Sequence, residues 1–279
     1  VRQMRLFADS LCVAALAALG SMALGAPAGW AVARLPRRRR TFFVACLALP
    51  ALLPGYVLAT AWSDLLSPVG ISKTLGWAEP FWPCQGPVAS GFVLAMSYFP
   101  LVALAVGLNI ASTDARHLEA ARLVASPWRV FYGIGLPQTL PALFEGTALV
   151  FLLALLAFAV PSLMQTNVYP VEIYERFSAT GDAGAAAAQS LPLLALTLPL
   201  ALAWRAFVRR KKAWRGGGAR MLPPLDKGMP RKAATGYCIA LATVSAGLPV
   251  AILLARAHPL SSLFEAWSTA REEIATSFG

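Results

Sequence analysis

The sequence predicts an all-α polytopic membrane protein with about six transmembrane helices. Its 279 residues have a mean hydropathy of +0.62 and a charged fraction of 13%, whereas soluble domains carry about 25% charged residues. Crossing the hydrocarbon core takes a helix of about 20 apolar residues, and six segments reach that length: 8–33, 42–63, 88–108, 141–160, 183–204 and 235–256. None of them alternates apolar and polar residues as a strand would, so helices are expected.

The first two segments carry features that bear on how their helices pack. Ser21, Gly25 and Gly29 recur every four residues in the first segment, a spacing that permits close approach of another helix. Pro50 and Pro54 fall within the second segment. Spanning helices tolerate prolines where neighbouring helices support the backbone, so both segments are still expected to span.

The distribution of positive charge predicts the orientation of the spans. If successive span ends alternate between sides, one side receives 18 of the 24 Lys and Arg, from 34–40, 109–140 and 205–232. The positive-inside rule makes that side cytoplasmic and places the N-terminus of the chain outside. The motif "RLPRRRR" directly after the first segment also favours a retained span over a cleaved signal peptide. The basic stretch 205–232 is more simply interpreted as a loop near anionic lipid than as a nucleic-acid site.

The sequence offers no catalytic, cofactor-binding or metal-binding set. It contains neither a G-x-x-x-x-G-K-[ST] phosphate loop nor G-x-S-x-G or H-E-x-x-H. His117 and His258 are expected on opposite sides of the membrane, and the four cysteines have no disulfide or metal spacing. Glu145 lies near the start of its span and can reach the interface, so an ion-coupled secondary transporter has little intramembrane charge to work with.

The segment 109–140 interrupts the apolar chain with charge on the predicted cytoplasmic side. Thr113 or Asp114 can cap a helix in which Arg116, Glu119 and Arg122 recur at three-residue spacing. A short amphipathic helix of this kind can dock into a groove of a soluble partner or lie on the membrane surface. The residues themselves leave both interpretations open.

The segment 161–182, on the predicted outer side, resembles a short amphipathic helix at the membrane surface. Ile173, Tyr174 and Phe177 lie at helical spacing. Its polar residues either border a substrate path or provide ordinary surface polarity: Gln165, Asn167, Glu172, Glu175 and Arg176.

The stretch "EAARLVASPWRVFYGIGLP" resembles the cytoplasmic E-A-A loop of binding-protein-dependent ABC importer permeases. The segment "LFADSLCVAALAALGSMALGAPAGWAVARLPRRRR" is similar to the first core helix of these permeases, with Asp9 where Asn is usual. "SYFPLVALAV" and "PSLMQTNVYPVEIYERFS" resemble the segments before and after the loop. Within the family, the sequence looks most similar to fused two-half permeases of the iron(III) and thiamine type.

The resemblance implies the type I ABC importer permease (MetI-like) fold and the function of an inner-membrane transport subunit without catalytic residues. It implies a cytoplasmic ABC ATPase dimer, a periplasmic substrate-binding protein, a second permease half or copy and membrane lipid as partners. Glu119 would pair with a basic group of the ATPase, and Leu136-Pro137 would set the return of the loop. The ATPase-coupling loop would comprise Arg116, Glu119, Ala120, Ala121, Arg122, Ala125, Ser126, Pro127, Leu136 and Pro137.

The sequence departs from the family pattern in two respects. The glycine expected before "ASPWR" is absent, since Val124 directly precedes Ala125, and the stretch from Glu119 to Pro137 is shorter by one residue. Glycine there permits a turn with positive φ, so attachment to an ATPase is a safer expectation than coupled transport. The chain also resembles part of a fused permease: a first half over 1–207, a basic linker over 208–234, and the first span and start of a second half over 235–279.

The sequence therefore predicts an ATP-driven importer permease, with an ion-coupled transporter or a non-functional permease fragment as alternatives. A membrane-embedded enzyme would need a clustered nucleophile, base or metal set, which is missing. Iron(III) is the substrate suggested by likeness, while thiamine, polyamine, phosphonate and sulfate remain open.

Overall fold

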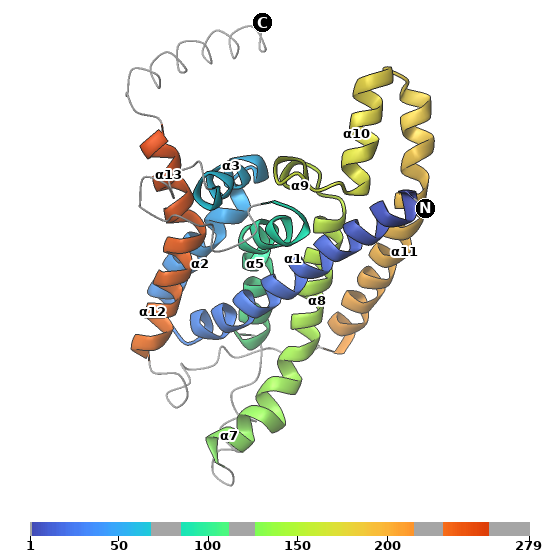
Figure 1. Ribbon diagram of the computed structural model, residues 1–279. Helices are drawn as coiled ribbons and strands as arrows, with labels where there is room; N and C mark the ends of the chain where they lie inside the picture. The colour runs from blue at the N-terminus through green and yellow to red at the C-terminus, as the bar shows by residue number, and fades with distance from the viewer. Residues whose placement is uncertain (1, 68–84, 112–125, 215–230, 257–279) are drawn as a thin grey trace, which may run out of the picture.

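A computed structural model describes residues 2–67, 85–111, 126–214 and 231–256, and within those ranges all regular structure is helical (Figure 1). The first part contains α1 (Arg2–Ala33), α2 (Arg37–Leu52), α3 (Gly55–Leu66) and α5 (Pro87–Ala111). The middle part contains α7 (Pro127–Val130), the π-helical turn η1 (Phe131–Gly135), α8 (Leu136–Leu155), α9 (Ala159–Leu163), α10 (Tyr169–Thr180) and α11 (Ala183–Trp214). The last part contains α12 (Arg231–Ala242), the π-helical turn η2 (Thr243–Gly247) and α13 (Leu248–Arg256).

Length and composition qualify five stretches of the described residues as membrane spans: Arg2–Ala33, Pro87–Ala111, Tyr132–Leu155, Ala183–Arg209 and Lys232–Arg256. A sixth candidate is the pair Arg38–Leu52 and Gly55–Leu66, whose axes differ by 86°. The fold class predicted from the sequence, an all-α membrane protein with about six spans, is thus confirmed.

The segment predicted as one straight second span, 42–63, is broken in the structure. Leu53 ends α2 in an extended conformation with φ −74° and ψ 138°. The ring of Pro54 clashes with a helical residue before it, which is why Leu53 leaves the helix. The chain restarts as α3 after a bend of 86°, whereas Pro50 remains inside α2. The expectation that a span over 42–63 would tolerate Pro54 is therefore wrong.

The helices α1 and α5 pack closely through small residues, as the spacing of Ser21, Gly25 and Gly29 predicted. A Cβ atom on Gly25 would lie 2.6 Å from the carbonyl oxygen of Phe99, and one on Gly29 would lie 2.6 Å from that of Ala103. The hydroxyl of Ser21 donates a hydrogen bond to the carbonyl of Ala95 over 3.3 Å. Backbone therefore meets backbone along this pair, which leaves no space for side chains.

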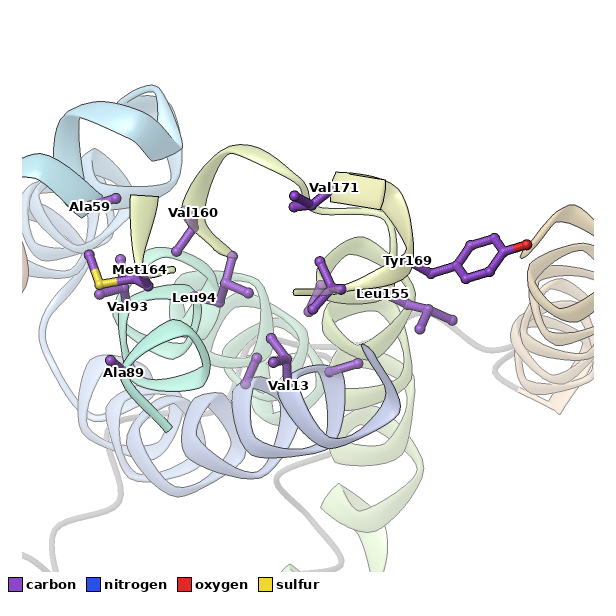
Figure 2. Packing of buried hydrophobic residues seen from close by; sticks show 14 of the residues in the cluster. Val13, Ala59, Ala89, Val93, Leu94, Leu155, Val160, Met164, Tyr169 and Val171 are labelled. Atoms are coloured by element: carbon purple, nitrogen blue, oxygen red, sulfur yellow. The ribbon is translucent and has the colours of Figure 1, made fainter. Parts of the chain in front are cut away.

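A hydrophobic core on the same side as the start of α1 joins most of the helices. Figure 2 shows Val13 of α1, Leu94 of α5, Leu155 of α8 and Val160 of α9 converging with Met164. Tyr169 is fully buried at the start of α10, where its ring stacks on Phe7 with centroids 4.2 Å apart. This core fixes the connection between α8 and α10 against the first half of α5.

The helices α12 and α13 pack against the beginning of the chain. The hydroxyl of Tyr237 donates a hydrogen bond to the carbonyl of Leu24 over 2.9 Å, and Cys238 is buried against α1 and α2. At the far end of α13, Arg256 forms an ion pair with Asp64 of α3. The helical bounds overlap the predicted linker 208–234 at both ends, since α11 continues to Trp214 and α12 begins at Arg231.

Candidate functional site

Two features at opposite ends of the molecule form the candidate site: the predicted coupling loop and a polar pocket. Figure 1 shows the start of α7 and the ends of α1 and α5 toward one end, while α9, α10 and the start of α11 lie toward the other. Most of the predicted loop residues lie outside the described residues: Arg116, Glu119, Ala120, Ala121, Arg122 and Ala125. Of the remainder, Ser126 and Pro137 are exposed and Leu136 is half-buried.

The chain returns from the loop as one unbroken helix rather than by a turn at Leu136-Pro137. Helix α7 begins at Pro127, passes through η1 and continues as α8 to Leu155. The helix runs through Leu136-Pro137, which were expected to set the return of the loop, and the candidate span begins at Tyr132 rather than near 141. Pro137 lies one residue into α8, directly after the π turn, and proline is favoured at the first positions of a helical segment.

A side-chain hydrogen bond and close backbone packing hold together α5 and α8, the two helices that flank the predicted loop. The amide nitrogen of Asn109, near the end of α5, donates to the carbonyl of Gln138 in α8 over 2.9 Å. About two turns further on, Gly146 of α8 faces α5 so closely that a Cβ would lie 2.9 Å from the Cα of Val102. The two helices that flank the loop are therefore joined directly below it.

The opposite end of these helices opens into a polar pocket with a volume of about 430 Å³. Four elements contribute to it: the start of α1, the start of α5, the segment between α9 and α10, and α10 itself. The lining residues are Arg2, Arg5, Leu6, Asp9, Pro87, Gln165, Thr166, Asn167 and Glu172. Three of these, Gln165, Asn167 and Glu172, were singled out in the sequence as candidate borders of a substrate path.

The charges of the pocket are only partly neutralised. Arg2 and Glu172 form an ion pair with an N–O distance of 2.9 Å. Arg5 and Asp9 make no hydrogen bond or ion pair with any other residue that the structure describes. An unpaired guanidinium and carboxylate beside amide and hydroxyl groups can bind a polar or charged solute.

The segment 164–168, which forms the pocket floor, is held in place by backbone and hydroxyl contacts. The N–H of Gly86 donates to the carbonyl of Met164 over 2.8 Å, and the hydroxyls of Ser90 and Thr166 are hydrogen-bonded at 2.6 Å. Gln165 adopts a positive φ of 53°, which is uncommon for a residue with a side chain. These contacts attach the segment to the start of α5.

The other polar residues suggested by the sequence do not line the pocket. Glu175 is exposed, and Arg176 donates to the side-chain carbonyl of Gln189 over 3.4 Å. Conversely, Arg2, Arg5 and Asp9 line the pocket although the sequence did not mark them as site residues. Their position at the start of the first span was the available signal.

The pocket and the two ends of the predicted coupling loop are connected through the same two helices. Helix α5 begins at Pro87, in the pocket, and ends at Ala111, where the loop departs. The helix that starts at Pro127 runs back to Leu155 and leads through α9 to Gln165. A displacement of the loop therefore has a direct helical route to the pocket.

Comparison with known proteins identifies this architecture. Residues 25–213 match the family described as the binding-protein-dependent transport system inner membrane component. The chain belongs to this family. It is a permease component of an ABC importer, a multi-pass inner-membrane protein and not itself an enzyme, as the sequence predicted. The family implies an ATPase subunit and a substrate-binding protein as partners.

Similar proteins carry different substrates. The molybdenum transport system permease protein ModB of Escherichia coli (strain K12) is 29% identical over 226 residues, covering 74% of this chain and 94% of that protein. ModB of Haemophilus influenzae is 32% identical over 171 residues, covering 57% of this chain and 70% of the relative. The Fe(3+)-transport system permease protein FbpB 2 of the same species is 23% identical over 258 residues, which cover 91% of this chain and 48% of that protein.

These identities differ from the likeness expected from the sequence. The molybdenum permeases are identical to the chain at a higher percentage of aligned residues than the iron(III) permease is, although the iron(III) alignment covers more of the chain. Iron specificity is therefore not established by similarity.

Proposed function

We propose that this chain forms the substrate path of its importer and receives the force of ATP binding through the loop around Glu119. The observation that supports this most is the connection of the polar pocket to the two ends of the loop by α5 and α8. In this proposal the pocket around Arg5 is the outer mouth of the path. The predicted coupling helix would occupy a cleft of the ATPase subunit.

The proposed mechanism uses differential binding between two conformations. ATP binding favours a closed ATPase pair, and the loop contacts transmit that preference to the membrane helices. Asn109 and Gln138 join the flanking helices, so α5 and α8 would move together at the loop end. Their other ends would then widen or narrow the pocket between Pro87, Gln165 and Arg5.

The proposed orientation places the pocket outside and the loop in the cytoplasm. Among the described residues, the end of the molecule that bears the loop carries Arg34, Arg38, Arg39, Arg40, Arg129, Arg205, Arg209 and Lys232. The pocket end carries Arg2, Arg5, Arg176 and Arg256. The positive-inside rule supports a periplasmic N-terminus for this chain.

The proposed organisation is a permease unit over 1–207, a basic linker over 208–234 and the start of a second unit over 235–279. The family match ends at 213, and α12 follows the linker as a further candidate span. A second permease half or copy would complete the path. A permease fragment without transport activity is the alternative.

We propose molybdenum, in its aqueous form the molybdate dianion, as the first substrate to test. Two relatives named as molybdenum permeases support it, and Arg5 has no anionic partner among the described residues. A bound anion would be favoured by a free guanidinium and by the amides of Gln165 and Asn167. Iron(III) is the second candidate because the alignment with the iron(III) permease covers 91% of the chain.

Attachment to the ATPase is tested by co-purification of the chain with the ATPase subunit of its importer. Glu119→Ala should reduce the co-purified ATPase, because the variant loses the expected pair with a basic group. Glu175→Ala removes an exposed carboxylate on α10, which lies on the pocket side, and serves as the matched control. Failure of the unmodified chain to retain any ATPase would contradict the coupling-loop proposal.

Substrate identity is tested by uptake of radioactive molybdate or iron(III) in cells that contain the complete importer. We expect molybdate uptake that depends on the ATPase and falls in Arg5→Gln. Arg176→Gln is the control, because Arg176 lies on the same side outside the pocket. Iron(III) uptake without molybdate uptake would overturn the molybdate assignment but retain the permease function.

A further inference from the structure

A second cavity, with a volume of about 250 Å³, lies at the opposite end from the polar pocket and is almost wholly apolar. It is formed where the ends of α1 and α5 meet the first half of α2. Apolar side chains from the three helices surround it, including Val32, Leu47 and Leu104. Among its described lining residues, Arg40 is the only charged one and Thr41 is its neighbour in sequence.

The apolar cavity adjoins a surface suited to hydrocarbon. Leu108, which lines it on α5, is 68% exposed, and on α2 the nearby Phe42 and Leu49 are 63% and 48% exposed. Large exposed apolar side chains around a groove indicate contact with lipid or with another protein. The lining of the cavity and the exposed surface beside it are therefore both apolar, as expected for a surface in contact with membrane lipid.

Positive charge is concentrated where α2 begins, at the edge of this cavity. Arg38 and Arg39 are exposed and Arg40 is half-buried, while Arg34 lies over the ring of Trp30 with its guanidinium carbon 5.7 Å from the ring centroid. None of the acidic residues that the structure describes lines the cavity. Basic clusters beside a membrane span attract acidic lipid headgroups.

The amino end of α2 adds to this preference. Pro36 precedes the helix and provides no side-chain hydrogen bond to its first turn. The first N–H groups of a helix and its dipole favour an anion such as a phosphate. Groups that can bind a phosphate therefore lie directly beside a cavity that can hold an acyl chain.

We infer that the cavity between α1, α2 and α5 binds an anionic phospholipid of the leaflet on the arginine-rich side. One acyl chain occupies the apolar cavity, and the headgroup phosphate lies against Arg38, Arg39 and Arg40. A neutral transport substrate would have few polar groups to contact here, and an apolar protein segment would leave the exposed guanidinium groups of Arg38 and Arg39 without an anion. The lipid satisfies both halves of the site.

The inference is tested by native mass spectrometry of the full-length chain extracted from vesicles of equal phosphatidylglycerol and phosphatidylcholine content. The unmodified protein should retain phosphatidylglycerol in preference to phosphatidylcholine. Replacing Arg38, Arg39 and Arg40 together by Gln should lower that preference by about fivefold for each arginine that contacts the phosphate. Arg205→Gln with Arg209→Gln is the matched control, because both are exposed on α11 and neither lines the cavity.

A second variant tests the acyl-binding half independently of charge. Ala48 lines the cavity, whereas Ala45 is exposed on the same helix and does not. Ala48→Leu should fill the cavity and reduce retained phospholipid of both kinds, while Ala45→Leu should not. Both proteins should elute as folded species, since Ala48→Leu places its larger side chain in the open cavity and Ala45→Leu places its own on the exposed face of α2.

Three results would overturn the inference. The first is equal retention of phosphatidylglycerol and phosphatidylcholine by the unmodified chain. The second is equal lipid retention by Ala48→Leu and Ala45→Leu. The third is that Ala48→Leu leaves lipid retention unchanged but separates two copies of the chain, in which case the cavity is a protein interface.

Discussion

The helices α5 and α11 are both long, apolar and suited to span a membrane, yet they pack very differently. In the most hydrophobic stretch of each helix, 61% of the residues of α5 are buried within the protein, compared with 11% of those of α11. Mean hydropathy over those windows is 2.0 for α5 and 1.8 for α11. Hydropathy thus predicts that both helices span but does not distinguish a central helix from a peripheral one.

The difference arises from residue size and spacing rather than from polarity. Helix α5 presents Gly91, Ala95 and Gly107 to α1 and receives Gly146 of α8, so its backbone lies close to two neighbours. Helix α11 instead exposes leucines along much of its length, including Leu194, Leu198 and Leu202. In a bilayer such leucines lie in lipid without penalty, and small residues determine where helices meet.

The largest expected effect comes from shortening the same side chain in the two helices. Leu94 of α5 is 1% exposed and Leu194 of α11 is 54% exposed. Leu94→Ala leaves a cavity and should lower the free energy of unfolding by about 2–5 kcal/mol, whereas Leu194→Ala should change it by less than about 0.5 kcal/mol. Unfolding in mixed micelles with increasing dodecyl sulfate measures both.

A similar loss in the two variants would mean that α11 is buried by another protein in the assembled importer. Repeating the measurement with the chain alone and with its partners separates those cases.

The next effect tests close packing at glycine. Gly25→Ala places a methyl group 2.6 Å from the carbonyl oxygen of Phe99, and backbone cannot easily yield. We expect a loss of about 1–3 kcal/mol from this overpacking. Gly236→Ala on α12 meets no atom within 4 Å, so it should stabilise its helix by about 0.5–1 kcal/mol. Thermal unfolding in detergent checks both signs, and stabilisation by Gly25→Ala would contradict the packing of α1 on α5.

A smaller effect concerns the attachment of the peripheral helix. The indole nitrogen of Trp204 in α11 donates to the carbonyl of Glu145 in α8 over 3.0 Å. Trp204→Phe removes this hydrogen bond and should cost about 0.6 kcal/mol, a typical value between membrane helices. Hydrogen exchange should increase along α11 but not along α5. Increased exchange in both helices would show that α11 supports the core.

The smallest effect is expected at the ion pair between Arg256 and Asp64. The two side chains are 55% and 20% exposed, so solvent screening keeps their coupling small. A double-mutant cycle with Arg256→Gln and Asp64→Asn measures that coupling. It should decrease in high salt, and a coupling that is insensitive to salt would indicate a desolvated pair instead.

The parts of the fold that could be predicted are those that depend on apolar length and small-residue spacing. Six apolar runs and the Ser21–Gly25–Gly29 pattern correspond to observed helices and to the observed contact of α1 with α5. The bend at Leu53 could not be predicted from the presence of prolines alone, because Pro50 lies inside α2 while Pro54 follows the end of that helix. Whether a proline breaks a span depends on which carbonyls neighbouring helices can satisfy, and that is a property of the tertiary structure.

The candidate site was only partly foreseeable. Gln165, Asn167 and Glu172 were identified from the polarity of one segment, and the structure joins them to Arg2 and Arg5 from the far end of the sequence. These residues come together because α1 and α10 pack around a common core. The roles of Glu119 and its neighbours remain predictions, because those residues lie outside the described part of the chain.

The five-residue π turn η1 determines which way α7 faces relative to α8 and the core. A π turn holds one more residue than the α-helical turn it replaces, and one residue corresponds to about 100° of rotation around a helix. Removing Gly133, whose surroundings are open, would let α7 and α8 join as a regular α-helix. The residues Ser126 and Arg129 would then face a different direction relative to an unchanged core. If the coupling-loop proposal holds, an importer carrying that deletion should fold and reach the membrane but turn a different face of the predicted loop toward the ATPase.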